Sequence, residues 1–362
     1  MAEALRQAEP AAHVLFLCTQ RDIDRRILQP GGFDFQTQPV RPLPKPWRPA
    51  EVLDFYRRWR ASLRQCETLL HQFDGGRRVV LGLGGFASGP AVKVAARLAV
   101  PRALLNPDAV PGKANRFARR YAQRIFLQWP VSRRHFLRDG QKCLVTGCPI
   151  RHVFATPSPT DRDRLTRQAR QALGLSPDRP LLAVVGGSQG GHTLNEAVLH
   201  CLTARQVLPS DWQLLHQTGL ADQPRVAQTY AAAHLPAVVL PFTDRMDLVL
   251  QAADLVLGRA GASSLAELTA LGVGSILVPY PYHRDRHQEH NARVLCEAGA
   301  AKIVADTGNA AQTAQALTAV LADCVKGECC RAMGQAAQRL ARPQAAADVA
   351  GELVRLAREN GG

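Results

Sequence analysis

Residues 184–193 read VVGGSQGGHT, and this stretch decides the fold. An apolar run ends in GGSQGG, and a helix-compatible stretch follows over residues 192–202. The pattern predicts a strand, a tight turn and a helix, an arrangement that lets backbone N–H groups and a helix N-terminus bind a diphosphate. The segment has no Gly-Lys-Ser/Thr ending, and no Gly-x-Gly-x-x-Gly with an acidic residue about 20 positions downstream. It therefore predicts a nucleotide-phosphate site of another kind.

The same alternation of strands and helices runs through the whole chain. Strands are predicted at residues 13–18, 79–83, 103–105, 125–128 and 143–146, then at 181–185, 213–217, 237–240, 255–257 and 275–278. Helical patterns lie between them, and such alternation predicts parallel sheets with right-handed crossovers. We expect an α/β protein with two doubly wound, Rossmann-like domains facing a cleft. Ligands of such sheets bind beyond the carboxyl ends of the strands.

A Pro- and charge-rich stretch, residues 156–164, separates the two series of strands. We therefore predict an N-terminal domain over residues 1–152 and a C-terminal domain over residues 153–342. The last segment, residues 343–362, has apolar residues at helical spacing and is predicted to be a closing helix.

The net charge of +15 is concentrated in one half of the chain. Residues 1–150 contain 25 Lys and Arg against 11 Asp and Glu, whereas the remainder is nearly balanced. The candidate partners are nucleic acid, an anionic membrane surface and a phosphorylated substrate, and the alternative is a solvated Arg-rich surface. Five Tyr and four Trp leave few aromatic side chains to stack on bases, which argues against nucleic acid.

Targeting and cysteine patterns point to a cytoplasmic protein. The first ten residues, MAEALRQAEP, lack the apolar region of a signal peptide, and no segment reads as a membrane span. The nine cysteines form no Cys-x-x-Cys or zinc spacing, so we expect buried free thiols.

Two further segments follow predicted strands. Residues 82–90, GLGGFASGP, form a second glycine turn, which either approaches a ligand closely or only tightens a strand-to-helix connection. Residues 258–267 read GRAGASSLAE, where Ser263 or Ser264 can cap a helix. Glu267 can accept hydrogen bonds from two ribose hydroxyls, or it can complete a capping box with Ser264.

Residues 282–291, YHRDRHQEHN, hold three histidines and an aspartate. A metal site is one interpretation, but the cluster lacks fixed carboxylate partners, and recognition of a sugar by Gln288 and Asn291 is favoured over it. A solvated helix start remains the third alternative. The Asp-x-Asp triplets at residues 22–24 and 161–163 lie beside arginines and are interpreted as chance occurrences. No metal and no cofactor is predicted.

The four segments, in this order, resemble the MurG-type N-acetylglucosaminyltransferases of peptidoglycan synthesis. The resemblance extends from about residue 12 to the final helix and implies the GT-B architecture, with an acceptor-binding N-terminal domain and a donor-binding C-terminal domain. It implies inverting transfer of GlcNAc from UDP-GlcNAc to a lipid-linked diphosphate acceptor, undecaprenyl-diphosphoryl-MurNAc-pentapeptide. It also implies a peripheral enzyme on the cytoplasmic face of the cell membrane, acting in cell-wall synthesis, cell shape and division.

The resemblance assigns donor-binding roles to ten residues: Arg151, Ser188, Thr243, Ala262, Ser263, Ser264, Leu265, Ala266, Glu267 and Gln288. Arg151 and Ser188 match positions near the donor phosphates, and Thr243 lies where a backbone group recognises uracil. Residues 262–267 match the loop and helix start at the nucleotide, with Glu267 on the ribose. Gln288 matches the glutamine that recognises GlcNAc hydroxyls.

Two departures from the family concern the acceptor side. The family begins with a strand and a Gly-Gly-Thr-Gly-Gly-His turn, whose histidine is often proposed as the general base, and this chain has no counterpart of either. We expect the true start codon to lie upstream of Met1, and we assign no catalytic base. Residues 105–108, LNPD, replace the family's usual His-Glu-Gln-Asn, and Asp108 receives no role.

Three alternatives stay open. A UDP-GlcNAc 2-epimerase would share the architecture, but the GLGGFASGP turn favours the transferase. A UDP-sugar-binding protein with impaired catalysis is compatible with the missing first turn. A nucleic-acid-binding protein is the third, and salt-dependent DNA binding would support it.

Overall fold

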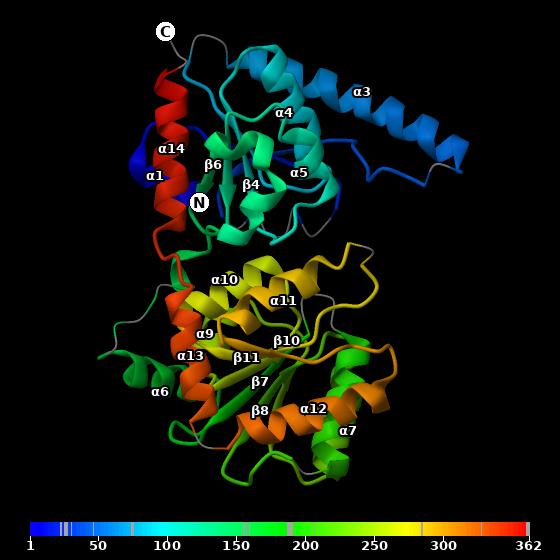
Figure 1. The fold of residues 1–362 in the computed structure, drawn as a ribbon, viewed down its shortest axis with the longest axis vertical. Helices are drawn as coiled ribbons and strands as arrows, with labels where there is room; N and C mark the ends of the chain where they lie inside the picture. The colour runs from blue at the N-terminus through cyan, green and yellow to red at the C-terminus, as the bar shows by residue number, and fades with distance from the viewer. Residues whose placement is uncertain are drawn as a thin grey trace. The chain divides into compact units, whose positions relative to one another are not determined.

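The chain folds into two compact units, which are shown in Figure 1. The computed structural model describes residues 1–21, 24, 28–29, 31–45, 47–73, 76–154, 156, 158, 160–186, 191–205, 207–283, 285–326 and 328–359. The N-terminal unit comprises Met1–Pro149 together with Gln344–Gly362, and the C-terminal unit comprises Ile150–Pro343. The domain limits predicted above, at residues 152 and 342, stay a prediction.

The C-terminal unit contains a six-stranded sheet in which every strand pairs in parallel. Its order is β12-β11-β10-β7-β8-β9, so the chain extends the sheet outward from β7 and then crosses to the other side of β7 at β10. The strands are β7 (Leu181–Val185), β8 (Gln213–Gln217), β9 (Ala237–Leu240), β10 (Leu255–Gly258), β11 (Gly274–Leu277) and β12 (Ala301–Ile303). The predicted parallel α/β fold is confirmed here.

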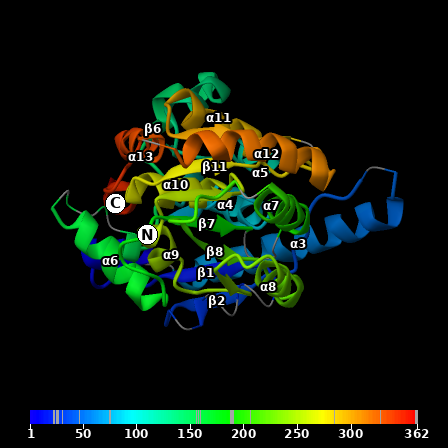
Figure 2. The same ribbon diagram turned by 90° about the horizontal axis from the view of Figure 1, so that it is seen from below.

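Helices cover both faces of this sheet. They are α6 (Arg162–Ala172), α7 (His192–Arg205), α8 (Gln223–Ala232), α9 (Met246–Ala252), α10 (Ala262–Leu271), α11 (His287–Glu297), α12 (Ala310–Cys324) and α13 (Cys329–Arg339), with the 3-10 turn η3 (His152–Phe154). Helices α7 and α12 pack together, as do α6 and α9, and Figure 2 shows α12 and α6 on opposite sides of β7. The sheet is therefore buried on both faces.

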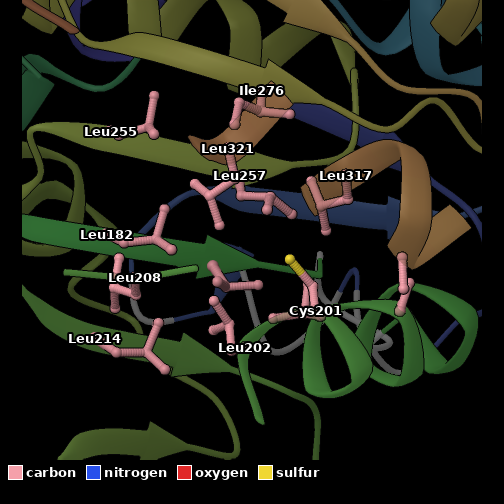
Figure 3. Close-up of a cluster of buried hydrophobic side chains, with 14 of the residues drawn as sticks. Leu182, Cys201, Leu202, Leu208, Leu214, Leu255, Leu257, Ile276, Leu317 and Leu321 are labelled. Carbon is pink, nitrogen blue, oxygen red and sulfur yellow. The ribbon is translucent and has the colours of Figure 1, made fainter. Parts of the chain in front are cut away.

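An aliphatic core lies between the sheet and the α7–α12 layer, as Figure 3 shows. Leu182 and Leu257 project from the strands toward Cys201 of α7 and Leu317 of α12, and all four are fully buried. Strands covered on both faces are typically continuous apolar runs, which explains why LLAVV and LVL were recognisable in the sequence.

The N-terminal unit has two separate parallel sheets. Strands β1 (Leu15–Cys18) and β2 (Asp34–Thr37) pair with each other, and a four-stranded sheet has the order β3-β4-β5-β6. Its strands are β3 (Val80–Gly82), β4 (Arg102–Asn106), β5 (Arg124–Leu127) and β6 (Cys143–Val145). The expected upstream strand stays a prediction.

The helices of the N-terminal unit include its first and last elements. They are α1 (Ala2–Ala8), α3 (Pro49–Gln72), α4 (Ser88–Arg97), α5 (Lys113–Ala118) and α14 (Ala345–Glu359), with the 3-10 turns η1 (Pro130–His135) and η2 (Leu137–Lys142). Helix α14 lies beside α1, and its Val349 and Leu353 pack against Phe126 of β5. Helices α3 and α4 pack against each other over a different cluster, which includes Val94. The predicted closing helix thus completes the core of the N-terminal unit.

No helix among the described residues combines the length and the apolar character needed to cross a membrane.

Candidate functional site

The carboxyl ends of β7 and β10 mark the point where the strand order of the C-terminal unit reverses. Open parallel sheets bind ligands at such a point, because the loops that leave the two strands diverge. The strands approach closely, since a Cβ on Gly258 would lie 2.8 Å from the carbonyl oxygen of Val185. Ser188 and the rest of residues 187–190, which carry the prediction of a phosphate turn, lie outside the described residues.

A buried ion pair holds the two diverging loops together. Arg259, directly after β10, donates to the Asp306 carboxylate at 2.8 Å, to the Thr193 hydroxyl at 2.9 Å and to the Val278 carbonyl at 3.0 Å. The side chains of Arg259 and Asp306 are only 10% and 2% exposed. Burial alone would raise the pKa of Asp306, but hydrogen bonds from Gly308 N–H, Arg259 and Thr193 lower it. The pair stays ionised and fixes the loop after β10 to the start of α7.

Arg259, Asp306 and Thr193 were not predicted as site residues. The signal available was the charged residue placed immediately after the buried strand LVLG, because a charge at that position must find a partner. Its partners lie 66 and 47 residues away along the chain. Spacing alone does not predict such distant contacts.

The start of α10 differs from the capping box considered above. Its N-cap residue is Gly261, no side chain caps the helix, and Ser263 and Ser264 are exposed. The prediction that one of these serines is the N-cap is therefore wrong, because glycine at that position already adopts the extended conformation. Among the flanking residues of the predicted site, Ala262 is half-buried, and Leu265 and Ala266 are buried. The serine hydroxyls remain available to a ligand.

Glu267 is a half-buried carboxyl group on the first turns of α10. Burial raises the pKa of Glu267 to about 7, and the positive charge of Arg151 lowers it in part. Arg151 precedes η3, which packs against α10, and its guanidinium lies 5.1 Å from the ring centre of Phe154. The structure thus brings two of the predicted donor residues into electrostatic contact. A carboxyl group kept in a poorly solvated position with a raised pKa is typical of functional sites.

Gln288 lies on the first turn of α11 and points its carbonyl oxygen back to the sheet edge. Its Oε1 accepts from Tyr280 N–H at 2.9 Å and from Ala260 N–H at 3.3 Å. Asn291, one turn further on, donates to the Ala260 carbonyl at 3.3 Å. In the described part of the chain, Gln288 Nε2 has no partner, so this amide group is fixed in place with donors to spare.

The histidines near Gln288 form ring contacts. His287 Nδ1 lies 2.8 Å from the Asp285 carboxylate, and the rings of His283 and His287 stack with centroids 4.4 Å apart. Among the described residues no group of three His, Cys, Asp or Glu side chains is arranged to hold a metal ion. Of the Asp-x-Asp triplets, Asp24 accepts from Thr19, and Asp161 pairs with Arg164.

Thr243 follows β9, which strand β8 separates from β7. Its hydroxyl accepts from the N–H of Arg245 at 3.0 Å, so the side chain stabilises its own turn. Glu267 follows β10, three strand spacings from β9, which corresponds to roughly 14 Å, a distance that a nucleotide can span but a side chain cannot. The structure therefore places Thr243 apart from Glu267 and Gln288 on the same sheet edge.

The second glycine turn lies in the N-terminal unit between β3 and α4. Gly84 and Gly85 have φ angles of +87° and +72°, a region that favours glycine. Ser88 donates to the Gly84 carbonyl at 2.9 Å, and Asn115 lies beneath the turn, where its Nδ2 donates to Asn106. Among the residues that the structure describes, no group donates a hydrogen bond to the buried Asn115 Oδ1. Gly84, Gly85 and Ser88 thus form a tight turn between β3 and the start of α4.

Comparisons with known proteins match both units to one family. Residues 1–127 match the glycosyltransferase family 28 N-terminal domain, and residues 181–349 match the glycosyltransferase family 28 C-terminal domain. The chain is 34% identical over 352 residues to the UDP-N-acetylglucosamine–N-acetylmuramyl-(pentapeptide) pyrophosphoryl-undecaprenol N-acetylglucosamine transferase of Halothermothrix orenii, covering 95% of this chain and 91% of that protein. The transferase of the same name from a Nocardioides strain is 37% identical over 310 residues, covering 84% and 80%.

Solved structures share the fold. The crystal structure of Acinetobacter baumannii MurG matches with a TM-score of 0.71 at 24% identity, covering 98% of this chain and 95% of that chain. A UDP-GlcNAc 2-epimerase from Neisseria meningitidis matches with a TM-score of 0.62 at 12% identity, covering 99% and 94%. At these identities the likeness concerns the fold alone, and it confirms the predicted GT-B class.

Proposed function

The chain belongs to glycosyltransferase family 28, and on this premise we propose that it transfers N-acetylglucosamine from UDP-GlcNAc to undecaprenyl-diphosphoryl-MurNAc-pentapeptide in peptidoglycan synthesis. The observation that carries the proposal is the carboxyl group of Glu267. It is held half-buried at the carboxyl edge of the six-stranded sheet, next to a cationic side chain. Such a group can accept hydrogen bonds from the two vicinal hydroxyls of a ribose. Because the carboxyl group is half-buried, water is a poorer substitute for these hydroxyls than it would be at an exposed position.

The other donor contacts follow from their places on the same edge. Arg151 and the start of α7 would hold the diphosphate, together with Ser188, whose position is not described. The spare amide N–H groups of Gln288 would bind the hydroxyls of GlcNAc. The backbone at Thr243 would recognise uracil.

The reaction requires no metal in this proposal. The acceptor hydroxyl attacks the anomeric carbon in line, its oxygen forms the new glycosidic bond, and the bond to the departing UDP breaks. The electron pair leaves on the diphosphate, whose growing charge Arg151 and the helix N-terminus stabilise. The acceptor hydroxyl loses its proton to a base that we do not assign. Inversion at the anomeric carbon follows from the in-line geometry.

The N-terminal unit would bind the acceptor. The start of α4, with Gly84 and Gly85 in left-handed conformations, exposes N–H groups that can receive a lipid-linked diphosphate. We also place this unit at the anionic, cytoplasmic surface of the cell membrane.

An exposed apolar patch with basic neighbours supports membrane binding. Leu43, Trp47, Leu53 and Tyr56 are 65%, 69%, 73% and 56% exposed, at the start of α3 and just before it. Basic side chains flank them in the sequence, Arg41, Lys45, Arg48 and Arg57, of which Arg48 pairs with Glu51 and Arg57 with Asp54 at exposed positions. Apolar groups that enter a bilayer interface, surrounded by cations that attract anionic lipids, form a peripheral membrane site. The substitution pair L53S/Y56S should reduce sedimentation with anionic vesicles, and unchanged sedimentation would contradict this part.

The transfer assay uses the purified full chain with radiolabelled UDP-GlcNAc and a lipid-diphosphate acceptor. We expect label in the lipid fraction, and we expect Gln288→Ala to lower kcat/KM by roughly tenfold to a hundredfold, as loss of a sugar hydrogen bond does. Gln315→Ala, an exposed amide on α12, is the matched control and should leave kcat/KM unchanged.

Three outcomes decide between the candidates. Labelled lipid supports the transferase. Release of free sugar without an acceptor would instead identify an epimerase-like reaction. UDP-GlcNAc binding by calorimetry without turnover would leave a binding protein and would sink the transferase proposal for this polypeptide.

A further inference from the structure

A basic pocket of about 740 Å³ lies in the N-terminal unit, away from its glycine turn. Four cationic side chains line it, and Glu359 of α14 is its one anionic side chain. The cations are Arg102, Arg120, Arg124 and Lys142. The rest of the lining is mixed: Tyr121, Gln123 and Gln141 are aromatic or polar, and Ala122 and Leu356 are apolar. The pocket therefore has a strong excess of positive charge.

The sheet topology explains why these cations meet. Arg102 is the first residue of β4, Arg124 is the first residue of β5, and Lys142 directly precedes β6. The strands are parallel and in register, with Ala103 opposite Arg124 and Ile125 opposite Cys143, so their amino ends share one edge of the sheet. The glycine turn after β3 leaves from the opposite edge. The pocket is thus separate from the proposed acceptor turn.

Two of the four cations have no anionic partner in the described part of the chain. Arg102 donates to the carbonyls of Tyr121 at 2.6 Å and Val100 at 2.9 Å, which are neutral acceptors. The Arg120 guanidinium lies over the rings of Phe117 and Tyr121, at 4.7 and 5.0 Å. Burial lowers the pKa of Arg102, as expected for a cation held without a counter-charge.

Each of the other two cations has one carboxylate partner. Arg124 binds Glu352 of α14 at 2.6 Å, and Lys142 binds Asp139 at 3.1 Å. These carboxylates fix the positions of the two cations, and Arg124 also donates to the Gln123 carbonyl at 3.0 Å, so only part of their N–H groups is left for a ligand. The pocket is therefore arranged in advance to receive an anion.

We propose that this pocket binds a phosphate group. The planar guanidinium groups of Arg102 and Arg120 match the oxygens of a phosphate, and such charge-assisted hydrogen bonds are about twice as strong as neutral ones. The pocket is open to solvent, so the phosphate can be carried on a larger body that extends out of it. That body is either a lipid or a soluble metabolite, and the two share the same recognition chemistry. The inference does not depend on transferase activity, because every residue involved lies in the N-terminal unit.

The first experiment is calorimetric titration of the full chain with inorganic diphosphate, in which the two double variants below are compared with wild type. The double substitution R120Q/K142Q should weaken binding by roughly tenfold or more, about one charge-assisted hydrogen bond per side chain. R133Q/R138Q removes the same charge from exposed positions of η1 and η2 outside the pocket and should change the affinity by less than about twofold. Equal unfolding temperatures of the two variants show that both are folded.

A second arm distinguishes the sources of the phosphate. Wild type and both variants are sedimented with phosphatidylcholine vesicles, with and without phosphatidic acid. A loss of phosphatidic acid binding by R120Q/K142Q alone assigns the pocket to a lipid headgroup. Weaker diphosphate binding with unchanged vesicle binding assigns it to a soluble phosphate compound. Equal behaviour of the two variants in both arms overturns the proposal.

Discussion

The two units are built from the same kind of parallel sheet but handle charge differently. In the C-terminal unit an ion pair, Arg259 with Asp306, is almost fully buried where the strand order reverses. In the N-terminal unit the corresponding pair, Arg124 with Glu352, remains 27% and 13% exposed. The C-terminal unit uses its buried ion pair to fix the loops around the proposed nucleotide site. The N-terminal unit keeps most of its cations at the surface, where they can bind a phosphate group or an anionic membrane.

Removing the buried carboxylate tests this difference between the two ion pairs and should have the largest effect on stability. Asp306→Ala leaves the Arg259 charge buried without its partner, and we expect it to lower the free energy of unfolding of the C-terminal unit by about 4 kcal/mol. Hydrogen exchange followed by mass spectrometry measures each unit separately. In the N-terminal unit, Glu352→Ala should cost about 1 kcal/mol, because water can solvate Arg124. Equal costs in the two units would show that burial does not distinguish the pairs.

The pH dependence of stability tests the buried carboxyl group. The folded pKa of Glu267 is about 7, above its ordinary value of 4.5, so the folded state holds a proton that the unfolded state has lost between these values. The contribution of this carboxyl group to the free energy of unfolding is fully present below pH 4.5 and is lost as the pH rises through 7. Glu267→Gln should therefore stabilise the protein above pH 7 by at most about 3 kcal/mol. The gain should vanish below pH 4.5, and a gain that is independent of pH would refute the assigned pKa.

The same substitution should weaken nucleotide binding. Glu267→Gln removes the charged acceptor proposed for the ribose hydroxyls, and we expect the Kd for UDP to rise roughly 30-fold, equivalent to about 2 kcal/mol. The wild-type affinity should increase as the pH rises through 7, because the carboxylate is the better acceptor. Calorimetry with UDP and with 2′-deoxy-UDP checks the contact. If Glu267→Gln weakens the binding of the deoxy compound as much as it weakens the binding of UDP, Glu267 does not contact the 2′-hydroxyl of the ribose.

The glycine turn of the N-terminal unit offers the smallest effect. Gly84→Ala forces an L-residue into a backbone conformation with φ near +87°, and we expect a loss of about 1 kcal/mol in that unit. Gly140→Ala, in η2, meets open space and is the matched control with no measurable loss. If Gly84→Ala leaves the free energy of unfolding of that unit unchanged, the turn adjusts its backbone without an energetic cost.

The sequence predicts the buried strands well and the exposed ones poorly. β7 begins and ends where its apolar run does, because a strand covered on both faces needs unbroken apolar residues. The limits of β8 and β9 also match the prediction, although β8 contains the buried polar residues Gln213, His216 and Gln217 and β9 is only half-buried. β2 was not predicted because its residues DFQT are alternately exposed and half-buried, and β12 has only three residues. The 24-residue helix α3 was not predicted either, since its polar composition conceals the apolar side.

Candidate site residues close in sequence were easier to predict than those brought together by folding. Glu267 and Gln288 lie in recognisable motifs, and the structure places both on one sheet edge. The capping role considered for Glu267 and Ser264 was wrong, because Gly261 starts the helix without a side-chain cap. The Arg259–Asp306 pair could not be predicted, because only the tertiary fold brings β10 and the loop after β12 together.

The position of α14 has a consequence for synthesis on the ribosome. The N-terminal unit needs Val349, Leu353 and Leu356 to complete its core, yet these residues are translated only after the whole C-terminal unit. Nascent domains generally fold in the order in which they emerge from the ribosome. Here, however, all residues of the C-terminal unit are translated before the last helix of the N-terminal unit. The N-terminal unit therefore waits, with the apolar face of β4 and β5 uncovered, through the translation of nearly two hundred residues. During that interval it is the part of the nascent chain most in need of a chaperone.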